Sequence, residues 1–203
     1  MQYLKKNVYD KIYAAAVEEF KACGYANASI RNIAYNAEVS VGNVYRYFTD
    51  KESLYLAIIN PFIESVKSGI ESGMMVPGTT TIENARHLVN FLMKNRDVIL
   101  IICKGETSYY DKFVDYILDV ASAKIKDIFA REVENIDEII SSHDFYNVIT
   151  QSFVYSLFKI LKDDEDVATQ ERKCCELITF YFGNLKSRFY HFQLWNKELK
   201  EAN

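Results

Sequence analysis

The residues able to make specific polar contacts are concentrated between Ser29 and Lys51, in the segment SIRNIAYNAEVSVGNVYRYFTDK. Its polar members are cations, amides and tyrosine hydroxyls, which donate hydrogen bonds to phosphate oxygens and to the edges of nucleotide bases. They are Arg31, Asn32, Asn43, Tyr45, Arg46, Tyr47 and Lys51. The chemistry that these groups offer is non-covalent recognition of a groove in duplex DNA.

The apolar residues of the same segment predict the elements that must position these groups. They first follow the i, i+3, i+4, i+7 spacing of one buried helical stripe, then cross a turn and resume the stripe. These positions are Ile30, Ile33, Ala34 and Ala37, then Val39 and Val41, then Val44 and Phe48. We expect two short helices joined by a tight turn, with the polar groups on the opposite face.

Together with the preceding helix, the segment resembles the DNA-binding domain of the TetR family of bacterial transcriptional regulators. The resemblance covers about the first 60 residues, and the remaining two thirds show no recognisable motif. It rests on Phe20, Gly24, Ile33-Ala34, Val39-Ser40, Tyr45-Arg46-Tyr47-Phe48 and Lys51-Glu52-Ser53-Leu54. Glu38 departs from the pattern, because the family usually has Gly at this helix end. A left-handed backbone is costly there for a residue with a side chain.

The resemblance implies roles for individual residues of this head. Arg31 matches a position that reaches a base edge, and Val41, Gly42 and Asn43 match the leading end of the recognition helix. Positions matching Tyr45, Tyr47 and Lys51 usually hold phosphates, and Arg46 can serve either purpose. The full predicted DNA-binding set is Arg31, Ser40, Val41, Gly42, Asn43, Tyr45, Arg46, Tyr47 and Lys51. The alternative for each is a surface charge or a small-core residue.

Composition predicts an all-α fold, because 203 residues contain only 7 Gly and 2 Pro. The resemblance implies a three-helix helix-turn-helix DNA-binding domain over residues 1–50 and a larger helical domain for effector binding and dimerisation over residues 51–203. The first helix should end at Gly24, and Ser29 and Ser40 should cap the next two. A capping box from Thr49 to Glu52 should start the fourth.

In the larger region we expect a short buried helix over Val98–Cys103 and two long closing helices, Asp144–Leu161 and Val167–Trp195. The resemblance implies that this last pair forms a four-helix interface with a second copy. The alternative is that the pair only packs internally. The predicted dimer contacts are Phe145, Ile149, Ser152, Ser156, Ile178, Tyr181, Leu185 and Phe189.

The resemblance also implies a small-molecule pocket among the central helices. Candidate lining residues are those that are aromatic or amphipathic there, although an aromatic residue at helical spacing is more often part of a core. They are Arg86, His87, Phe91, Tyr109, Tyr110, Phe113, Phe153 and Tyr181. The effector itself is not predicted.

The net charge of −4 is unevenly distributed. Residues 1–60 hold seven Lys/Arg and six Asp/Glu, for a charge of +1, and residues 61–203 carry −5. DNA affinity should therefore depend on local placement of a few cations, doubled in a dimer, and not on a broad positive field. Those cations are Lys5, Lys6, Arg31, Arg46 and Lys51.

Other classes of protein find little support. The four cysteines form no C-x-x-C pair and are expected to be reduced thiols. His87, His143 and His191 show no metal-ligand spacing, so neither a metal nor a cofactor is predicted. No nucleotide-binding or catalytic motif indicates an enzyme. No run of 18 apolar residues and no apolar signal core occurs, so we expect a cytoplasmic protein.

Two functions remain open at this point. The first is a ligand-responsive transcriptional regulator, a repressor that binds a palindromic operator as a homodimer and is released by a small-molecule effector. The alternative is a helical ligand-binding or adaptor protein whose trihelical head does not bind DNA. The near-neutral head and Glu38 are the features that favour the alternative.

Overall fold

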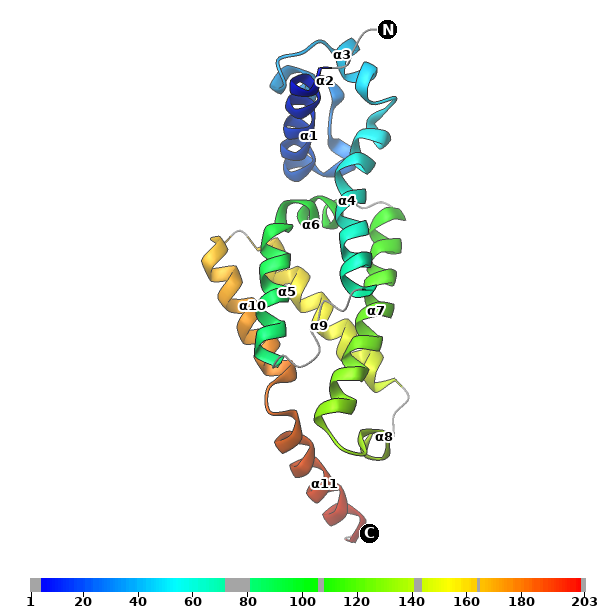
Figure 1. Ribbon diagram of the computed structural model, residues 1–203, viewed down its shortest axis with the longest axis vertical. Helices are drawn as coiled ribbons and strands as arrows, with labels where there is room; N and C mark the ends of the chain where they lie inside the picture. The colour runs from blue at the N-terminus through cyan, green and yellow to red at the C-terminus, as the bar shows by residue number, and fades with distance from the viewer. Residues whose placement is uncertain (1–4, 72–80, 106–107, 141–143, 164, 202–203) are drawn as a thin grey trace. The chain divides into compact units, whose positions relative to one another are not determined.

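The computed structural model describes residues 5–71, 81–105, 108–140, 144–163 and 165–201. The chain is all-α, as predicted, and none of the residues in these ranges forms a strand (Figure 1). It divides into two compact units. The first comprises Met1–Val76 with Asn90–Phe113, and the second comprises Pro77–Val89 with Val114–Asn203.

The helices keep the labels of Figure 1. Unit 1 contains α1 (Lys6–Asn27), α2 (Ile30–Asn36), α3 (Val41–Tyr47), α4 (Lys51–Glu71) and α6 (Arg96–Cys103). Unit 2 contains α8 (Ile136–Ile139), α9 (Phe145–Lys162), α10 (Val167–Phe182) and α11 (Leu185–Glu201). Two further helices, α5 (Thr81–Lys94) and α7 (Ser108–Glu132), each contain residues of both units. The predicted division after residue 50 stays a prediction, and the two compact units differ from it in grouping α4 and α6 with the helix-turn-helix.

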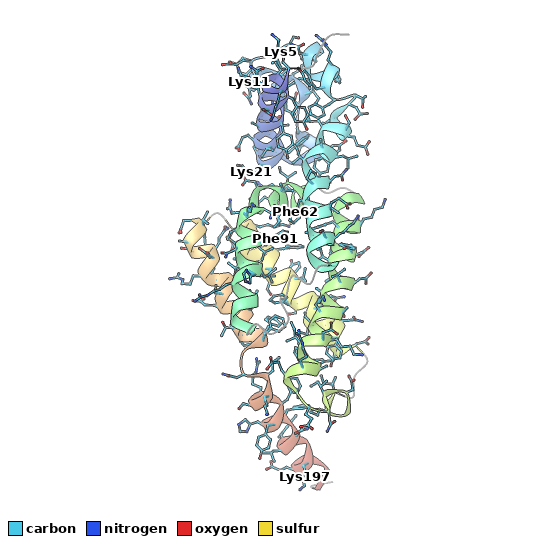
Figure 2. All side chains as sticks on the ribbon, in the orientation of Figure 1. Lys5, Lys11, Lys21, Phe62, Phe91 and Lys197 are labelled. Carbon is cyan, nitrogen blue, oxygen red and sulfur yellow. The ribbon has the colours of Figure 1, made fainter. Side chains whose placement is uncertain are left out.

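The core of unit 1 explains this difference. The apolar stripe of α1 is shielded from solvent at Ile12, Ala16 and Phe20. The apolar run expected to form a short buried helix is α6, whose Ile99 and Ile102 are buried. Because α6 packs against both α1 and α4, its apolar surface completes the core under the head. In the same unit Phe62 and Phe91 lie side by side (Figure 2), with ring centroids 5.8 Å apart.

The helical part of α1 stops where the sequence predicts, at Gly24. This residue has φ 74° and ψ 170°, a conformation that residues with a Cβ rarely adopt. A Cβ placed on Gly24 would lie 2.6 Å from the carbonyl oxygen of Lys104, just after α6. The same junction is tied by the Lys104 ammonium, which donates to the carbonyl of Lys21 at 2.9 Å. Glycine is therefore required both by the backbone turn and by the close approach of α6.

Two of the three predicted caps are confirmed, and the third is replaced. Ser29 accepts a hydrogen bond from the Arg31 amide at the start of α2, and Ser40 accepts one from the Asn43 amide at the start of α3. At α4 the capping residue is Asp50 and not Thr49. The Asp50 carboxylate accepts from the Ser53 amide at 2.6 Å, while the Asp50 amide donates to the Ser53 hydroxyl. These bonds to Ser53 lower the pKa of Asp50.

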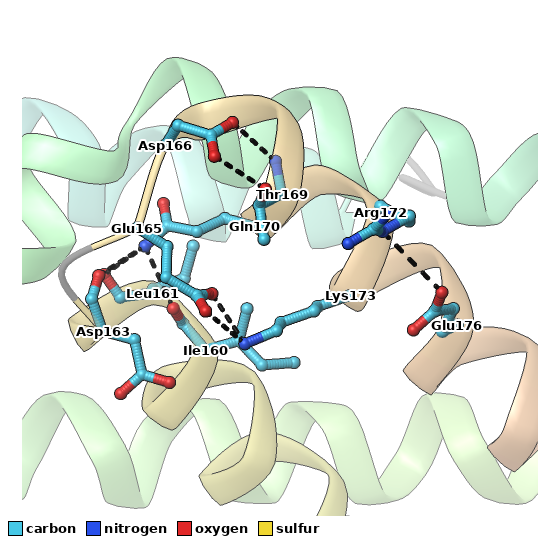
Figure 3. Close-up of polar contacts among 10 residues, drawn as sticks. All are labelled: Ile160, Leu161, Asp163, Glu165, Asp166, Thr169, Gln170, Arg172, Lys173 and Glu176. Carbon is cyan, nitrogen blue, oxygen red and sulfur yellow. Dashed lines mark hydrogen bonds and ion pairs between the residues drawn. The ribbon is translucent and has the colours of Figure 1, made fainter.

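In unit 2, α9 and α10 pack against each other as a helical hairpin closed by buried Gln170 (Figure 3). Its amide nitrogen Nε2 donates to the carbonyls of Ile160, Leu161 and Asp163 at 3.0, 3.3 and 2.8 Å. Those carbonyls end α9, where the last carbonyl groups of a helix have no N–H donor from the helix itself. Asp166 caps α10 through the Thr169 amide at 2.9 Å. The side chain of Gln170, on α10, thus supplies the hydrogen-bond donors for the carbonyl groups at the end of α9.

Gln170→Leu should destabilise the protein, because it keeps the bulk of the side chain but leaves buried carbonyls without a donor. We expect a loss of about 1–3 kcal/mol, with Tm falling by ~2–4 °C for each kcal/mol in a chain of this size. Thermal unfolding followed by circular dichroism measures the change. Gln151→Leu is the matched control, since Gln151 is exposed on α9. An equal effect at both positions would contradict the capping role.

The last predicted helix, Val167–Trp195, is in fact two. The helix is interrupted at Gly183 and Asn184, and Asn184 adopts a left-handed φ of 54°. A Cβ on Gly183 would lie 2.5 Å from the Thr179 carbonyl oxygen. The close turn therefore separates α10 from a distinct C-terminal helix, α11.

The cysteines are free thiols, as expected, and differ in burial. Burial, followed by the neighbouring Cys175 and Glu171, raises the pKa of Cys174 to about 11. Only about one Cys174 in a thousand is then a thiolate at pH 8. With Ellman's reagent we expect exposed Cys23 to react quickly in the native protein and Cys174 only after unfolding. Cys23→Ser should remove the fast phase, and rapid native labelling of Cys174 would contradict its assignment as a structural thiol.

Two surveys of the described residues add to this picture. Among those residues no helix is both long and apolar enough to cross a membrane. Within the same ranges no cluster of three or more His, Cys, Asp or Glu side chains is arranged to hold a metal ion.

Candidate nucleic-acid interface

The exposed side of α2 carries a cation and an aromatic ring. Arg31 is exposed, and Tyr35 is 84% exposed. Residues four apart lie on the same face of a helix, so the two side chains form one ridge. The opposite side of α2 is buried through Ile33 and Ala34. Tyr35 was not among the predicted contacts, although its spacing from Arg31 was a signal available in the sequence.

The predicted recognition helix α3 presents a second polar and aromatic ridge. Tyr45 is 51% exposed and Val41 36% exposed, while Val44, between them, is buried. Arg46 and Gly42 are exposed, and Asn43 is half-buried. The Asn43 bond to the Ser40 cap uses the backbone amide at 3.2 Å, so its side-chain amide is not required by the cap. One short helix therefore presents hydrogen-bond donors, the methyl groups of Val41 and, at Gly42, a backbone without a side chain.

A buried carboxylate positions α2 on α1. Glu19 is only 7% exposed, and its Oε1 accepts from the Ser29 amide at 2.9 Å and from the Asn32 side-chain amide at 3.1 Å. A carboxylate that accepts several N–H donors makes strong hydrogen bonds. Asn32, which faced the polar side in the sequence pattern, is thus committed to bracing the helix.

The turn between α2 and α3 contains the departure from the family pattern. Glu38 has a left-handed φ of 58°, so it adopts the glycine-like backbone that this position was expected to need. Its carboxylate accepts a hydrogen bond from the Lys11 ammonium at 2.9 Å, and this bond lowers the pKa of Glu38. The turn keeps its form with a side chain present, so Glu38 does not distinguish this head from a DNA-binding one.

Tyr47 lies at the end of α3 and ties it to the start of the chain. Its hydroxyl accepts from the Lys5 amide at 2.9 Å and donates to the Lys5 carbonyl at 3.1 Å. Its ring lies 6.3 Å from that of Tyr9 on α1. Tyr47 therefore positions α3 and the cationic N-terminal segment relative to each other.

Lys51 has an internal role at the first turn of α4. Its ammonium donates to the carbonyls of Tyr25, Ala26 and Ala28 at 2.8, 3.2 and 3.2 Å. It also lies 4.7 Å from the centre of the Tyr25 ring. An ammonium group has three N–H donors, and three carbonyls occupy them here. This geometry speaks against the predicted phosphate contact and assigns Lys51 to bracing the α1–α2 junction.

Lys51→Met should therefore lower stability without changing how DNA binding responds to salt. We expect a loss of about 1–3 kcal/mol, because the carbonyls lose their donor. Two phosphate contacts in a dimer would instead flatten the slope of log K against log salt by about 1.8. Thermal unfolding and anisotropy titrations at several salt concentrations measure both quantities. A reduced slope at unchanged Tm would restore the phosphate contact.

The cations of the head are not equally available. Lys11 pairs with Glu38, and Lys21 pairs with Glu18 and, at 3.3 Å, with Asp97. Lys5, Lys6 and Arg31 are exposed beside the helix-turn-helix. Figure 2 marks Lys5, Lys11 and Lys21 along unit 1. Lys5, Lys6 and Arg31 are therefore the exposed cations of the head for which no ion pair within it is described.

The predicted pocket residues do not form one cluster within the described units. Phe91 and buried Phe113 both contact Phe62 in unit 1, with centroids 5.8 and 5.7 Å from it. In unit 2, Phe153 packs on Tyr181 at 5.2 Å. Exposed His87 and Arg86 lie on α5, and the side chains of Tyr109 and Tyr110 lie outside the described residues. Arg86 lines a half-open hollow of about 1150 Å³ with Glu132, Glu134 and Tyr190.

The predicted dimer residues divide by burial. Ile178 and Leu185 are buried inside unit 2, so they are not available to a partner in this conformation. Phe145, Ile149, Ser156, Tyr181 and Phe189 are half-buried, and Ser152 is exposed. Val148 and Tyr155, which lie on the same predicted face of α9, are 60 and 73% exposed, and Phe180 of α10, which the prediction did not include, is 66% exposed.

Comparison with known proteins agrees with this geometry. Residues 12–58 match the family of bacterial regulatory proteins called the tetR family. The "Probable HTH-type transcriptional regulator YttP" of Bacillus subtilis (strain 168) is 32% identical over 69 residues, which are 34% of this chain and 33% of that protein. The chain thus matches about a third of the length of this relative.

Solved structures extend the similarity to most of the chain, at the level of fold. AibR, in complex with isovaleryl coenzyme A and operator DNA, has a TM-score of 0.62 at 20% identity, covering 87% of this chain and 98% of that one. FadR from Bacillus subtilis, in complex with stearoyl-CoA, has a TM-score of 0.53 at 18% identity, covering 84% and 97%. Residues 12–58 are therefore similar to the tetR family of bacterial regulatory proteins, and most of the chain shares its helical fold with these solved structures.

Proposed function

We propose that this protein is a DNA-binding transcriptional regulator, and specifically a repressor that binds a palindromic operator as a homodimer and leaves it when a small molecule binds. The observation that carries the proposal is the pair of exposed ridges on α2 and α3, held on a head braced by Glu19, Tyr47 and Lys51. The function is non-enzymatic, and it places the protein in the cytoplasm with the DNA.

The proposed contact set follows the exposed groups of the head. Arg31 and Asn43 read base edges, Val41 touches a thymine methyl, and Gly42 lets the backbone approach. Tyr45 and Arg46 contact phosphates beside them, with Tyr35 as an added candidate. Tyr47 and Lys51 support the head without contacting DNA, since their polar groups are hydrogen-bonded to backbone atoms.

A single short recognition helix reads few base pairs, so specificity requires a second head. Two heads related by a two-fold axis read inverted half-sites, which is why a homodimer and a palindrome belong together. We place the dimer contact on the side of α9 and α10 that exposes Val148, Tyr155 and Phe180. Ser152, whose hydroxyl lies 2.6 Å from that of Tyr181, belongs to the same surface.

Acyl thioesters of coenzyme A are the first effectors to test. Two solved proteins of this fold are bound to isovaleryl coenzyme A and to stearoyl-CoA, acyl chains of very different length. The test is displacement of bound operator by a series of acyl-CoA molecules, with free coenzyme A as the control. Release of the operator by acyl-CoA molecules of one range of chain lengths would support the proposal. If none of them released the operator, acyl-CoA would be excluded as the effector class.

Selection of bound sequences from a random DNA pool tests DNA binding itself. A dimeric regulator should enrich an inverted repeat whose half-sites lie about one helical turn, or a multiple of it, apart. Its affinity should also fall steeply as salt rises, because phosphate contacts release counterions. Absence of any enriched sequence would instead favour the adaptor function, in which the head does not bind DNA.

A further inference from the structure

The start of α1 carries two lysines that the fold of the head does not use. Lys5 and Lys6 are exposed, and the first turn of α1 holds no acidic residue. Residues 5–10 contain these two lysines and one aspartate, so the segment keeps a charge of +1. Uncompensated positive charge at the surface is what a protein offers to the phosphates of DNA.

The side chain of Tyr47 holds the backbone of Lys5 through both of its polar groups. The Tyr47 hydroxyl accepts from the Lys5 amide at 2.9 Å and donates to the Lys5 carbonyl at 3.1 Å. The same carbonyl accepts from the Val8 amide at 3.0 Å, so it also begins α1. Chain ends fray unless other contacts tie them down. Here the contact comes from 42 residues later in the chain, and it leaves the ammonium group of Lys5 unused.

This contact lies at the end and side of α3. Tyr47 is the last residue of the helix, and its ring lies 6.3 Å from that of Tyr9 on α1. A helix with its side chains is about 10–12 Å across and the major groove is about 12 Å wide, so a recognition helix fills the groove. A segment held beside that helix must therefore lie over one of the two sugar-phosphate strands that border the groove.

We propose that the segment beginning at Lys5 is a further DNA-contacting element, and that Tyr47 is a positioning residue that holds Lys5 and Lys6 against phosphates at the groove edge. The inference rests on the proposed DNA binding and adds to it. The family resemblance matches Tyr47 to a phosphate contact of its own, whereas here its hydroxyl acts on phosphate only through the two lysines. Contacts of this kind set the register of the head on the duplex and read no bases.

Lys5→Ala combined with Lys6→Ala measures what the two charges contribute. Alanine keeps the amide and carbonyl that Tyr47 holds, so the contact survives while the charge is lost. With one phosphate for each lysine in each subunit, the slope of log K against log salt should flatten by about 3.6. Anisotropy titrations with the selected operator at several salt concentrations give this slope.

Tyr47→Phe tests whether the hydroxyl acts through the lysines. We expect this variant to weaken operator binding and to flatten the same slope, although it removes no charge. Added to the double lysine variant, it should cause no further loss, because the groups that it positions are already gone. Tyr45→Phe is the comparison, since Tyr45 is proposed to touch a phosphate directly. Its effect should multiply with that of the lysine changes.

Cleavage by trypsin follows the contact in the absence of DNA. The bond after Lys6 lies in the first turn of α1, so its cleavage rate follows the population in which this turn is open. Loss of the hydrogen bonds to Lys5 should speed cleavage about 2- to 10-fold in Tyr47→Phe, measured by mass spectrometry. Tyr9→Phe is the matched control, because it removes a hydroxyl from the neighbouring ring and keeps both bonds to Lys5. Tm should be alike in all three proteins.

The outcomes separate this inference from the proposed function. Faster cleavage of Tyr47→Phe, with an effect on operator affinity that disappears in the double lysine variant, supports the inference. Effects that multiply would show that Tyr47 binds phosphate itself. Faster cleavage with unchanged affinity would show that the held segment does not touch DNA, and unchanged cleavage would overturn the contact with Lys5. Each of these three results overturns the inference and leaves DNA binding standing. A wild-type protein that binds no duplex fails the proposed function itself, before any variant is compared, and removes the inference with it.

Discussion

Gly24→Ala is expected to cost about 3 kcal/mol or more and to lower Tm by ~6–12 °C. The added methyl group meets two separate obstacles. Gly24 has φ 74° and ψ 170°, where a residue with a Cβ is strained, and the new carbon would lie 2.6 Å from the Lys104 carbonyl oxygen. The obstructing atom belongs to the backbone, so the clash is relieved only by moving α1 and α6 apart.

Gly42→Ala is the matched control for this prediction. A Cβ on Gly42 would meet only the Ser40 hydroxyl oxygen, at 3.9 Å, an ordinary contact distance. Alanine favours a helix over glycine by about 0.5–1 kcal/mol, so Tm should hold or rise. Thermal unfolding of both variants measures the difference. If Gly24→Ala left Tm unchanged, the tight junction between α1 and α6 would be contradicted.

Asn43→Ala is expected to reduce affinity for the selected operator by about 30-fold to 10⁴-fold. The range corresponds to one lost base contact of about 1–3 kcal/mol in each of two heads. Stability should not change, because the bond to the Ser40 cap uses the backbone amide that alanine retains. Binding to random DNA should also be preserved, since phosphate contacts supply most non-specific affinity.

The measurement is an anisotropy titration with operator and with random duplex at one salt concentration. Asn36→Ala supplies the control, because it makes the same substitution at an exposed position of α2 outside the proposed contacts. Equal losses on both duplexes would show that Asn43 positions the helix and reads no base. Loss of Tm would show that it stabilises the fold.

Two corrections show where reasoning from the sequence reached its limit. The last helix was predicted as continuous because Leu177, Tyr181 and Leu185 keep helical spacing across Gly183. The break depends on the left-handed turn at Asn184, which periodicity does not record. Lys51 was matched to a phosphate contact by its place in a motif. Its donors instead meet carbonyls 23 to 26 residues earlier in the chain.

The sequence by itself determined the local structure and the chemistry on offer: the stripe of α1, the stop at Gly24, the serine caps of α2 and α3, and the polar face around Asn43. These features depend on residues within one or two helical turns of each other, so spacing is enough to predict them. Only the tertiary structure decided which polar groups are left for a partner. Glu19, Tyr47 and Lys51 are all used inside the head, because contacts between distant segments compete for the same donors and acceptors.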